Sequence, residues 1–293
     1  MASSENQGLM NERASPYFQL HLAVALFGLA GLFGRWLNLH PILIVQGRTG
    51  FAALGLLLFL LFSRGFEKGT LSYYRNTAIL GLVLAFHWFA FFKAIQLTSL
   101  ALALLSFASF PLFTLMLEWL QGKEKIFKFD FLLVLLSLGG TFLIIPSDVN
   151  SPNFRGVIWG LASGLSFALM TVLNRSLVQN VKALRLAFHQ NAFAALFLLG
   201  FSLQLDLSFS ASEISLLVLL GLVFTALSHS LFVNALKSVK AKTASLIAAL
   251  EPIYGIVAAY FLFSEIPSMR SLLGGALIIS AGLISQFRNK LKT

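Results

Sequence analysis

The sequence contains an internal repeat with an offset of about 140 residues. Pro111 and Glu124 are 13 residues apart, Pro252 and Glu265 are also 13 apart, and the two pairs are offset by 141 positions. Two shorter matches keep this offset within about one residue: Gly34-Arg35 with Asn174-Arg175, and RTGFAAL from Arg48 with QNAFAAL from Gln190. A repeat of this length in an apolar chain predicts two equivalent membrane bundles around a shared cavity, an architecture typical of transporters.

The composition places the chain in a membrane. Of its 293 residues, 58% are hydrophobic and only 11% are charged, and the mean hydropathy is +0.85. Soluble domains carry about 25% charged residues, so this chain could not cover its own surface in water. We therefore expect an all-α, multi-pass protein of the cell membrane. The absence of cysteine excludes disulfides, thiolate metal sites and cysteine nucleophiles, and we expect neither a metal nor a cofactor.

Ten segments are apolar over about 20 residues, the length that one bilayer crossing needs. Several connections between them are very short, which forces antiparallel neighbours and leaves no room for a soluble domain. The polar stretch 1–16 shows no cleavable signal peptide, so we expect the first segment to act as both signal and anchor. The predicted transmembrane helices are Tyr17–Leu37, Ile42–Phe62, Ala78–Leu97, Leu100–Leu120, Phe127–Ile145, Gly156–Leu177, Leu184–Leu203, Ile214–Leu236, Thr243–Phe263 and Ser268–Phe287.

The basic residues predict the orientation of these helices. The two tails and the loops after the even-numbered helices hold sixteen Lys and Arg residues, whereas the opposite face and the helix interiors hold five. This asymmetry predicts cytoplasmic termini, and it explains the net charge of +10 without nucleic acid as a partner. Because five is an odd number of crossings, the second repeat is inverted relative to the first. The predicted parts are a cytoplasmic tail 1–16, a five-helix repeat 17–145, a linker 146–155, a second five-helix repeat 156–287 and a cytoplasmic tail 288–293.

Two segments carry a resemblance to a known family: HWFAFFKAIQLTSLALALLSFASFPLFTLMLEWLQGKEK, and HSLFVNALKSVKAKTASLIAALEPIYGIVAAYFLFSEIP in the second half. Each resembles a helix pair of the EamA-type branch of the drug/metabolite transporter superfamily. On this resemblance, Pro111 and Pro252 match the family's helix-breaking prolines, and Arg48 matches a basic residue early in helix 2. The resemblance implies transport of metabolites such as amino acids, sugars or nucleotide sugars, with export favoured by analogy alone.

Glu251 is the most informative single residue. It lies near the middle of the ninth predicted helix, where a carboxylate costs about 2.5–3.5 kcal/mol on insertion scales. Pro252 removes a backbone hydrogen bond at the same depth, and the surrounding helix face is small apart from Tyr254, which is a further candidate for the substrate site. The functional interpretation is a site for a substrate amine or a proton. The alternative is a structural carboxylate paired with Arg48, or with one of two membrane histidines.

Other polar residues within the predicted helices allow a functional and a structural interpretation. Arg48 could bind a substrate carboxylate and form a zwitterion clamp with Glu251, or it could extend to the exterior or bind a helix carbonyl. His87 and His229 suit a proton relay, and Trp88 suits stacking on an apolar or aromatic substrate. Each histidine could equally donate to a backbone carbonyl. The polar groups Gln190, beside His189 and Asn191, and Asn234 are weaker candidates that could simply hold helices together.

Several features favour structural roles. Arg35, Arg175 and Glu118 lie near helix ends, although Glu118 has no acidic counterpart and could belong to an inner gate. We expect Glu124 and Glu265 to cap or pin the helix that follows each of them. The series Gly156, Gly160, Gly164 and Ala168 predicts close packing of the sixth helix against a neighbour.

The sequence therefore predicts a secondary transporter for a small polar, amino-acid-like metabolite, working by alternating access. No P-loop is present, so protonation of Glu251 would couple transport to the proton gradient, or transport would be facilitated. The alternatives are a channel or a facilitative uptake permease, and dimerisation could complete a channel, so a homodimer is left open. An intramembrane enzyme is disfavoured because HExxH and a serine nucleophile with a partner base are lacking. The expected partners are a small-molecule substrate and the lipid bilayer.

Overall fold

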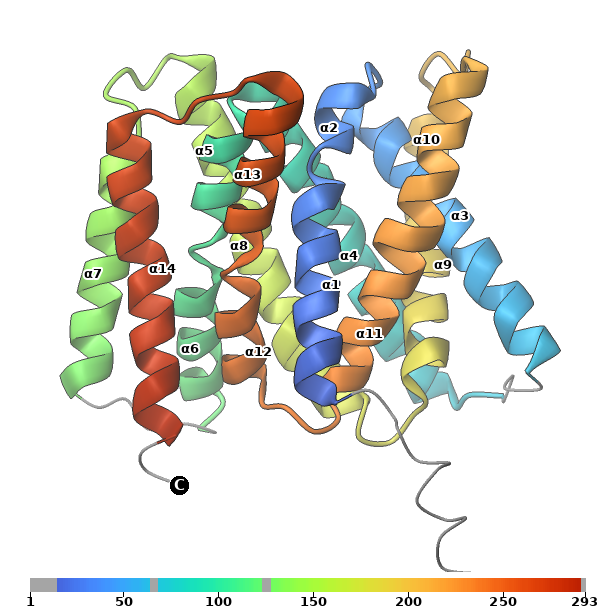
Figure 1. Cartoon of the computed structure of the whole chain (residues 1–293). Helices are drawn as coiled ribbons and strands as arrows, with labels where there is room; N and C mark the ends of the chain where they lie inside the picture. Colours follow the sequence, from blue (N-terminus) through green and yellow to red (C-terminus); the bar gives the residue numbers. More distant parts are fainter. Residues whose placement is uncertain (1–14, 64–67, 123–127, 291–293) are drawn as a thin grey trace, which may run out of the picture.

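The computed structural model describes residues 15–63, 68–122 and 128–290, and every regular element in these ranges is helical. The helices stand side by side and roughly parallel to one direction (Figure 1). They are α1 (Pro16–Ala30), α2 (Phe33–Trp36), α3 (Pro41–Phe62), α4 (Leu71–Leu97), α5 (Leu100–Phe107), α6 (Phe110–Leu120), α7 (Lys128–Ile144), α8 (Pro152–Leu177), α9 (Ala183–Ser202), α10 (Ala211–Gly221), a π-helical segment (Leu222–Leu227), α11 (Ser228–Ala235), α12 (Ala241–Ala248), α13 (Glu251–Phe263) and α14 (Met269–Lys290).

Eight segments of the described chain are long and apolar enough to cross a membrane. They correspond to predicted helices 1–4 and 6–9, counting the broken helices as single crossings. The helices in the remaining two positions, α7 and α14, carry shorter apolar stretches, Leu135–Ile144 and Met269–Ala281, and they pack along each other. The chain is therefore an all-helical membrane protein with eight candidate crossings, and the count of ten stays a prediction.

Two predicted helices are broken near their middle. The fourth divides into α5 and α6, and the ninth divides into α12 and α13 (Figure 1). A proline ring clashes with the carbonyl four residues earlier and offers no N–H to it. For Pro111 and Pro252 those carbonyls belong to Phe107 and Ala248, which are the last residues of α5 and α12. Each proline is the second residue of the helix that follows, a position where its missing N–H is tolerated.

A second irregularity lies in the predicted eighth helix. Residues Leu222–Leu227 form a π-helical segment between α10 and α11, where the Thr225 hydroxyl donates to the carbonyl of Leu220 at 2.7 Å. Such segments are rare and occur often at functional sites. Nothing in the hydrophobic pattern distinguishes this stretch from ordinary helix.

The glycines of α8 pack closely against neighbouring segments of the chain. A Cβ atom on Gly164 would lie 2.8 Å from the carbonyl oxygen of Phe107 at the end of α5, and one on Gly160 would lie 2.9 Å from the Cβ atom of Ser106. The predicted close packing of this helix is therefore present in the structure, and it holds α8 against the break between α5 and α6.

We expect Gly164→Ala to destabilise the protein even though alanine is the better helix former. The backbone carbonyl of Phe107 cannot move away as a side-chain end could, and overpacking of this kind costs about 1–3 kcal/mol. Gly200→Ala is the matched control, because a Cβ atom on Gly200 in α9 would meet none of the described residues within 4 Å. Thermal unfolding in nanodiscs should show a lower midpoint for Gly164→Ala and an equal or higher one for Gly200→Ala. Equal midpoints for both variants would show that the α8 contact is loose.

The described chain begins and ends on the same side of the bundle. The start of α1 and the end of α14 both lie at the lower face in Figure 1. The ends of α3, α8 and α11 and the start of α9 lie there too. We call this face the inner face and the opposite one the outer face, following the predicted orientation.

Candidate functional site

Five of the predicted site residues meet in one cavity at the centre of the bundle. Its wall is built by α1, α3, α4, α5, α8, α11 and α13, and so by both halves of the chain. The cavity volume is about 20 Å³, which holds about one water molecule, so the site is occluded in this conformation. The residues that carry the argument are Arg48, His87, Trp88, His229 and Glu251, together with the aromatic residues Phe27, Phe91, Phe107, Phe167 and Phe232.

Glu251 is the first residue of α13, and its side chain is 3% exposed. The sequence places Glu251 near the middle of the ninth predicted helix, and in the structure the proline-induced break comes just before it. A carboxylate at this position faces the positive end of the helix dipole of α13. Among the described residues no side chain forms a hydrogen bond or an ion pair with this carboxylate. The charged residue that interacts with it electrostatically is Arg48. The structural alternative, a direct pair with Arg48 or a histidine, is therefore not formed.

Arg48 lies on α3 and is 1% exposed, so its side chain does not extend to the exterior. Its Nε donates to the Thr225 hydroxyl at 3.0 Å, and Nη2 donates to the carbonyl of Phe224 at 3.4 Å. Both acceptors belong to the π-helical segment, which brings them towards α3. The guanidinium carbon also lies 3.8 Å from the ring centroid of Trp88, a cation–π contact. Trp88 thus stacks on Arg48 in this conformation, whereas stacking on a substrate was predicted.

The two membrane histidines both lie near Trp88, with ring centroids 6.3 Å (His87) and 6.0 Å (His229) from it. His87 of α4 places Nδ1 3.0 Å from the carbonyl of Ser163 in α8. His229 of α11 places Nδ1 3.2 Å from the side-chain nitrogen of Asn191 in α9, and its ring meets Trp88 edge-on at 6.0 Å. His87 therefore has the carbonyl contact of the structural interpretation, whereas His229 contacts a side-chain amide.

Most of the remaining wall is aromatic. Phe167 of α8 is its centre: its ring lies 5.3 Å from His87, 5.4 Å from Phe107 and 5.4 Å from Phe232. The three phenylalanines belong to three different helices, α8, α5 and α11, and no local pattern marks them among the thirty phenylalanines of the sequence. Apart from the four ionisable groups, the cavity is thus lined mostly by aromatic residues, together with Ala30 and Met170, and aromatic faces suit an organic cation or an apolar group.

The other three predicted substrate-site residues lie outside this cavity. The Gln190 side chain donates to Asn174 at 2.6 Å and links α9 to α8, and it is fully buried. The Asn234 side chain donates to Gln19 at 2.8 Å and links α11 to α1. Tyr254 is 36% exposed on α13 and does not line the cavity. For Gln190 and Asn234 the helix-linking interpretation describes the contacts that the structure shows.

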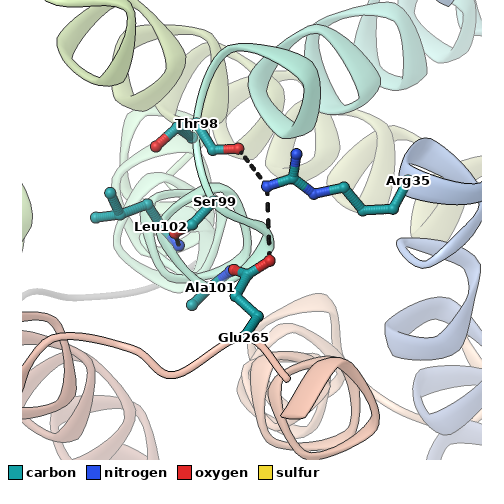
Figure 2. Close-up of polar contacts among 6 residues, drawn as sticks. All are labelled: Arg35, Thr98, Ser99, Ala101, Leu102 and Glu265. Carbon is teal, nitrogen blue, oxygen red and sulfur yellow. Dashed lines mark hydrogen bonds and ion pairs between the residues drawn. The ribbon is translucent and has the colours of Figure 1, made fainter. Parts of the chain in front are cut away.

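A polar cluster joins the two halves of the chain at the outer face, and Figure 2 shows its members. Arg35 Nη2 donates to the carbonyl of Thr98 at 2.9 Å and lies 3.5 Å from Glu265 Oε2. Glu265 Oε1 accepts from the backbone N–H of Ala101 at 3.1 Å. We call these four residues the outer clasp. The prediction that Glu265 caps the helix that follows it is wrong: it caps α5, 164 positions earlier. Glu124 lies outside the described residues.

Arg175, the repeat counterpart of Arg35, makes a similar contact at the inner face. It donates to the carbonyls of Leu236 and Lys237 at the end of α11, just as Arg35 donates to the carbonyl that ends α4. The sequence placed both arginines only near helix ends. The repeat offset between the two arginines can be read from the sequence. The carbonyls that they bind cannot, because backbone groups are not indicated by any side chain.

Comparisons with known proteins identify the family. The model of the EamA-like transporter family matches residues 15–145 and again residues 154–285. An uncharacterized transporter of Archaeoglobus fulgidus is 29% identical over 196 residues, which are 67% of this chain and 70% of that protein. An S-adenosylmethionine uptake transporter of Rickettsia conorii is 25% identical over 256 residues, 86% of this chain and 85% of that protein.

The fold is shared with a solved structure as well. A crystal structure of another protein has a TM-score of 0.70 to this one at 19% sequence identity, and the match covers 94% of this chain and 98% of that one. The family model matches both halves of the chain, so nearly all of the described helices are accounted for. The chain therefore belongs to the EamA-like transporter family, and it is a multi-pass membrane transporter, not an enzyme.

Proposed function

We propose that the central cavity binds a small amino-acid-like metabolite and carries it across the membrane by alternating access. The observation that supports this most directly is the separation of Glu251 and Arg48. Both are buried in one cavity, yet they form no ion pair with each other. A buried carboxylate and a buried guanidinium that are left apart can bind a substrate ammonium and a substrate carboxylate at the same time.

The aromatic residues of the cavity wall narrow the range of candidate substrates further. The phenylalanines of the wall offer π-faces to a cationic or aromatic part of the solute. S-adenosylmethionine, for which the Rickettsia conorii relative is named, carries an ammonium, a carboxylate, a sulfonium and an aromatic base. We therefore propose an amino-acid derivative with a cationic or aromatic side group. Protonation of Glu251 in the empty state supplies the coupling to a proton gradient.

We further propose ten crossings in two inverted repeats, 17–145 and 156–287, with both termini in the cytoplasm. Three observations support this arrangement. The proline breaks recur at the same place in both halves, Arg35 and Arg175 bind helix ends at opposite faces, and the described chain begins and ends at one face (Figure 1). The basic residues of the sequence favour that face as the cytoplasmic one.

The structure corresponds to one state of the proposed cycle. The outer clasp closes the outer face, and the central cavity is too small for a metabolite. A larger cavity of about 680 Å³ lies near the inner face, between α1, α3, α9 and α11. Opening towards this inner cavity would require the wall formed by α11 to move, and opening outwards would require the clasp to separate.

We expect Glu265→Ala to shift the protein towards an outward-open state. The change removes the ion pair with Arg35 and the acceptor for the Ala101 N–H, which together contribute about 1–2 kcal/mol, or a several-fold change in the population ratio. Because the sequence has no cysteine, spin labels at Asn38→Cys and Ser268→Cys report the outer opening without background. Double electron–electron resonance should show a larger fraction of long distances.

Arg270→Gln is the control for this prediction, because it removes an exposed charge near the start of α14 that belongs to no clasp contact. It should leave the distance distribution unchanged. If Glu265→Ala also leaves it unchanged while the thermal unfolding midpoint falls, the clasp stabilises the fold and does not gate the outer face.

Counterflow in proteoliposomes tests the proposed function. Vesicles containing the purified protein are loaded with individual L-amino acids, S-adenosylmethionine, sugars or nucleosides, and uptake of the labelled solute is followed at two pH values. Saturable exchange of one amino-acid derivative supports the proposal, and sided assays give the direction. Flux that rises linearly with concentration would identify a channel instead. The cavity is formed within one chain, so transport by a monomer is expected, and the homodimer stays a prediction.

A further inference from the structure

The two histidines of the central cavity differ in the kind of atom that contacts Nδ1. Neutral imidazole carries one proton, so the nitrogen that donates and the nitrogen that accepts are fixed by their partners. A backbone carbonyl can only accept, and a side-chain NH₂ group can only donate. The identity of the neighbouring atom therefore assigns the tautomer of each ring.

For His87 the neighbouring atom is an acceptor. Nδ1 lies 3.0 Å from the carbonyl oxygen of Ser163, and the ring must donate its proton there. The hydroxyl of Ser163 also lies 3.0 Å from Nδ1, but it has its own acceptor in the carbonyl of His87 at 3.2 Å. These contacts are mutually consistent only with Nδ1–H. Nε2 of His87 then carries the lone pair.

For His229 the neighbouring atom is a donor. The side-chain nitrogen of Asn191 lies 2.8 Å from the carbonyl of Ala187, which fixes the orientation of the amide, because its oxygen would be repelled there. The second hydrogen of the same NH₂ group points to His229 Nδ1 at 3.2 Å, which must accept. The proton of His229 therefore lies on Nε2. This Nε2 is buried and has no hydrogen-bond partner among the described residues.

We propose that the two histidines are held in opposite neutral tautomers, so that the cavity offers its substrate one fixed donor and one fixed acceptor. His229 presents Nε2–H, and His87 presents the lone pair of Nε2. Arg48 and Glu251 line the same cavity, and the charge that acts on both rings is that of Arg48. His229 Nε2–H then binds an acceptor of the solute, such as a carboxylate or ring nitrogen, and His87 binds a donor. This role in substrate binding rests on the proposed function, whereas the tautomers do not.

Nitrogen-15 NMR of histidine-labelled protein in nanodiscs tests the tautomers directly. The sequence has five histidines, and the signals of these two are assigned by their loss in His87→Gln and His229→Gln. We expect His229 to show a protonated Nε2 and an unprotonated Nδ1, and His87 to show the reverse. One shared tautomer, or a doubly protonated His229 at neutral pH, would overturn the proposal.

Two further variants test, one histidine at a time, which partner fixes the tautomer of the ring. Asn191→Leu removes the donor to His229, so its single tautomer should be replaced by a mixture while the His87 signals stay unchanged. Ser163→Ala removes the hydroxyl but keeps the backbone carbonyl, so His87 should keep Nδ1–H. A tautomer switch of His87 in Ser163→Ala would show that the hydroxyl is the donor and that the assignment is wrong.

The binding role has its own measurement. The amide nitrogen of a glutamine reaches the place of Nε2, whereas that of an asparagine reaches only the place of Nδ1. In counterflow of labelled S-adenosylmethionine and of labelled L-amino acids, His229→Gln should keep the apparent affinity within about threefold and His229→Asn should lower it about tenfold. Equal losses in both variants would remove His229 from the binding site. If no probe is exchanged even by the unaltered protein, the proposed function fails and the NMR result still decides the tautomers.

Discussion

Glu251→Gln is expected to remove proton-coupled transport while leaving the protein folded. The amide has nearly the shape of the carboxylate, but it carries no charge and cannot take up a proton. Hydrogen bonds to charged groups contribute about 1.5–3 kcal/mol, so the affinity for an ammonium-bearing substrate should fall about 10- to 150-fold. Any residual flux should no longer depend on the proton gradient.

The stability of this variant should be equal to or higher than that of the unaltered protein. Burial of a carboxylate without an ion pair is unfavourable, and Glu251 forms none among the described residues. A thermal unfolding scan in nanodiscs and counterflow at two pH values measure the two effects separately. Glu213→Gln is the control, because Glu213 is part of an exposed capping box with Ser210 that glutamine preserves.

Two results would contradict the role assigned to Glu251. Near-normal flux with an unchanged pH dependence would show that the carboxylate neither binds the substrate nor carries the proton. A loss of flux together with a much lower unfolding midpoint would show that Glu251 holds the break between α12 and α13 in shape.

The helix arrangement could be predicted from the sequence because its causes are local. Runs of about 20 apolar residues mark crossings, and a proline excludes the carbonyl four residues earlier. The same rule, applied to Pro252, places the end of a helix at Ala248, so the position of Glu251 after the break was accessible from the sequence.

The site could be predicted only where a residue type is costly in a membrane. Four residues of the site are marked in this way, because an ionisable group at that depth in a membrane is costly and is typically functional. They are Arg48, His87, His229 and Glu251. The aromatic wall, the π-helical segment and the partner of Glu265 were not found. Phenylalanine is common throughout an apolar chain, and backbone contacts between segments 164 positions apart leave no mark in either segment.

Arg48→Gln is expected to weaken binding of substrates that carry a carboxylate by about 10- to 150-fold and to leave amines without a carboxylate unaffected. Glutamine is the residue at the repeat position, Gln190, so the change makes the two halves more alike. Competition in counterflow between an L-amino acid and its decarboxylated amine measures the difference. Arg48→Lys is the companion variant. Lysine keeps the charge but lacks the planar group that stacks on Trp88 and reaches Thr225, so we expect an intermediate loss.

The alternative is that Arg48 serves only to satisfy the π-helical segment, and the hydrogen bonds of that segment argue against it. The Thr225 hydroxyl donates to the carbonyl of Leu220 at 2.7 Å, and the carbonyl of Phe224 accepts from the Ser228 hydroxyl at 2.8 Å, so both groups keep a partner when the guanidinium is removed. The unfolding midpoint of Arg48→Gln should therefore fall only modestly. Equal loss of amine and amino-acid binding, or a fall in protein abundance alone, would show that the arginine is structural. Arg48 is a buried cation that its neighbours do not require, and it forms no ion pair with Glu251. A substrate that binds both side chains explains this arrangement better.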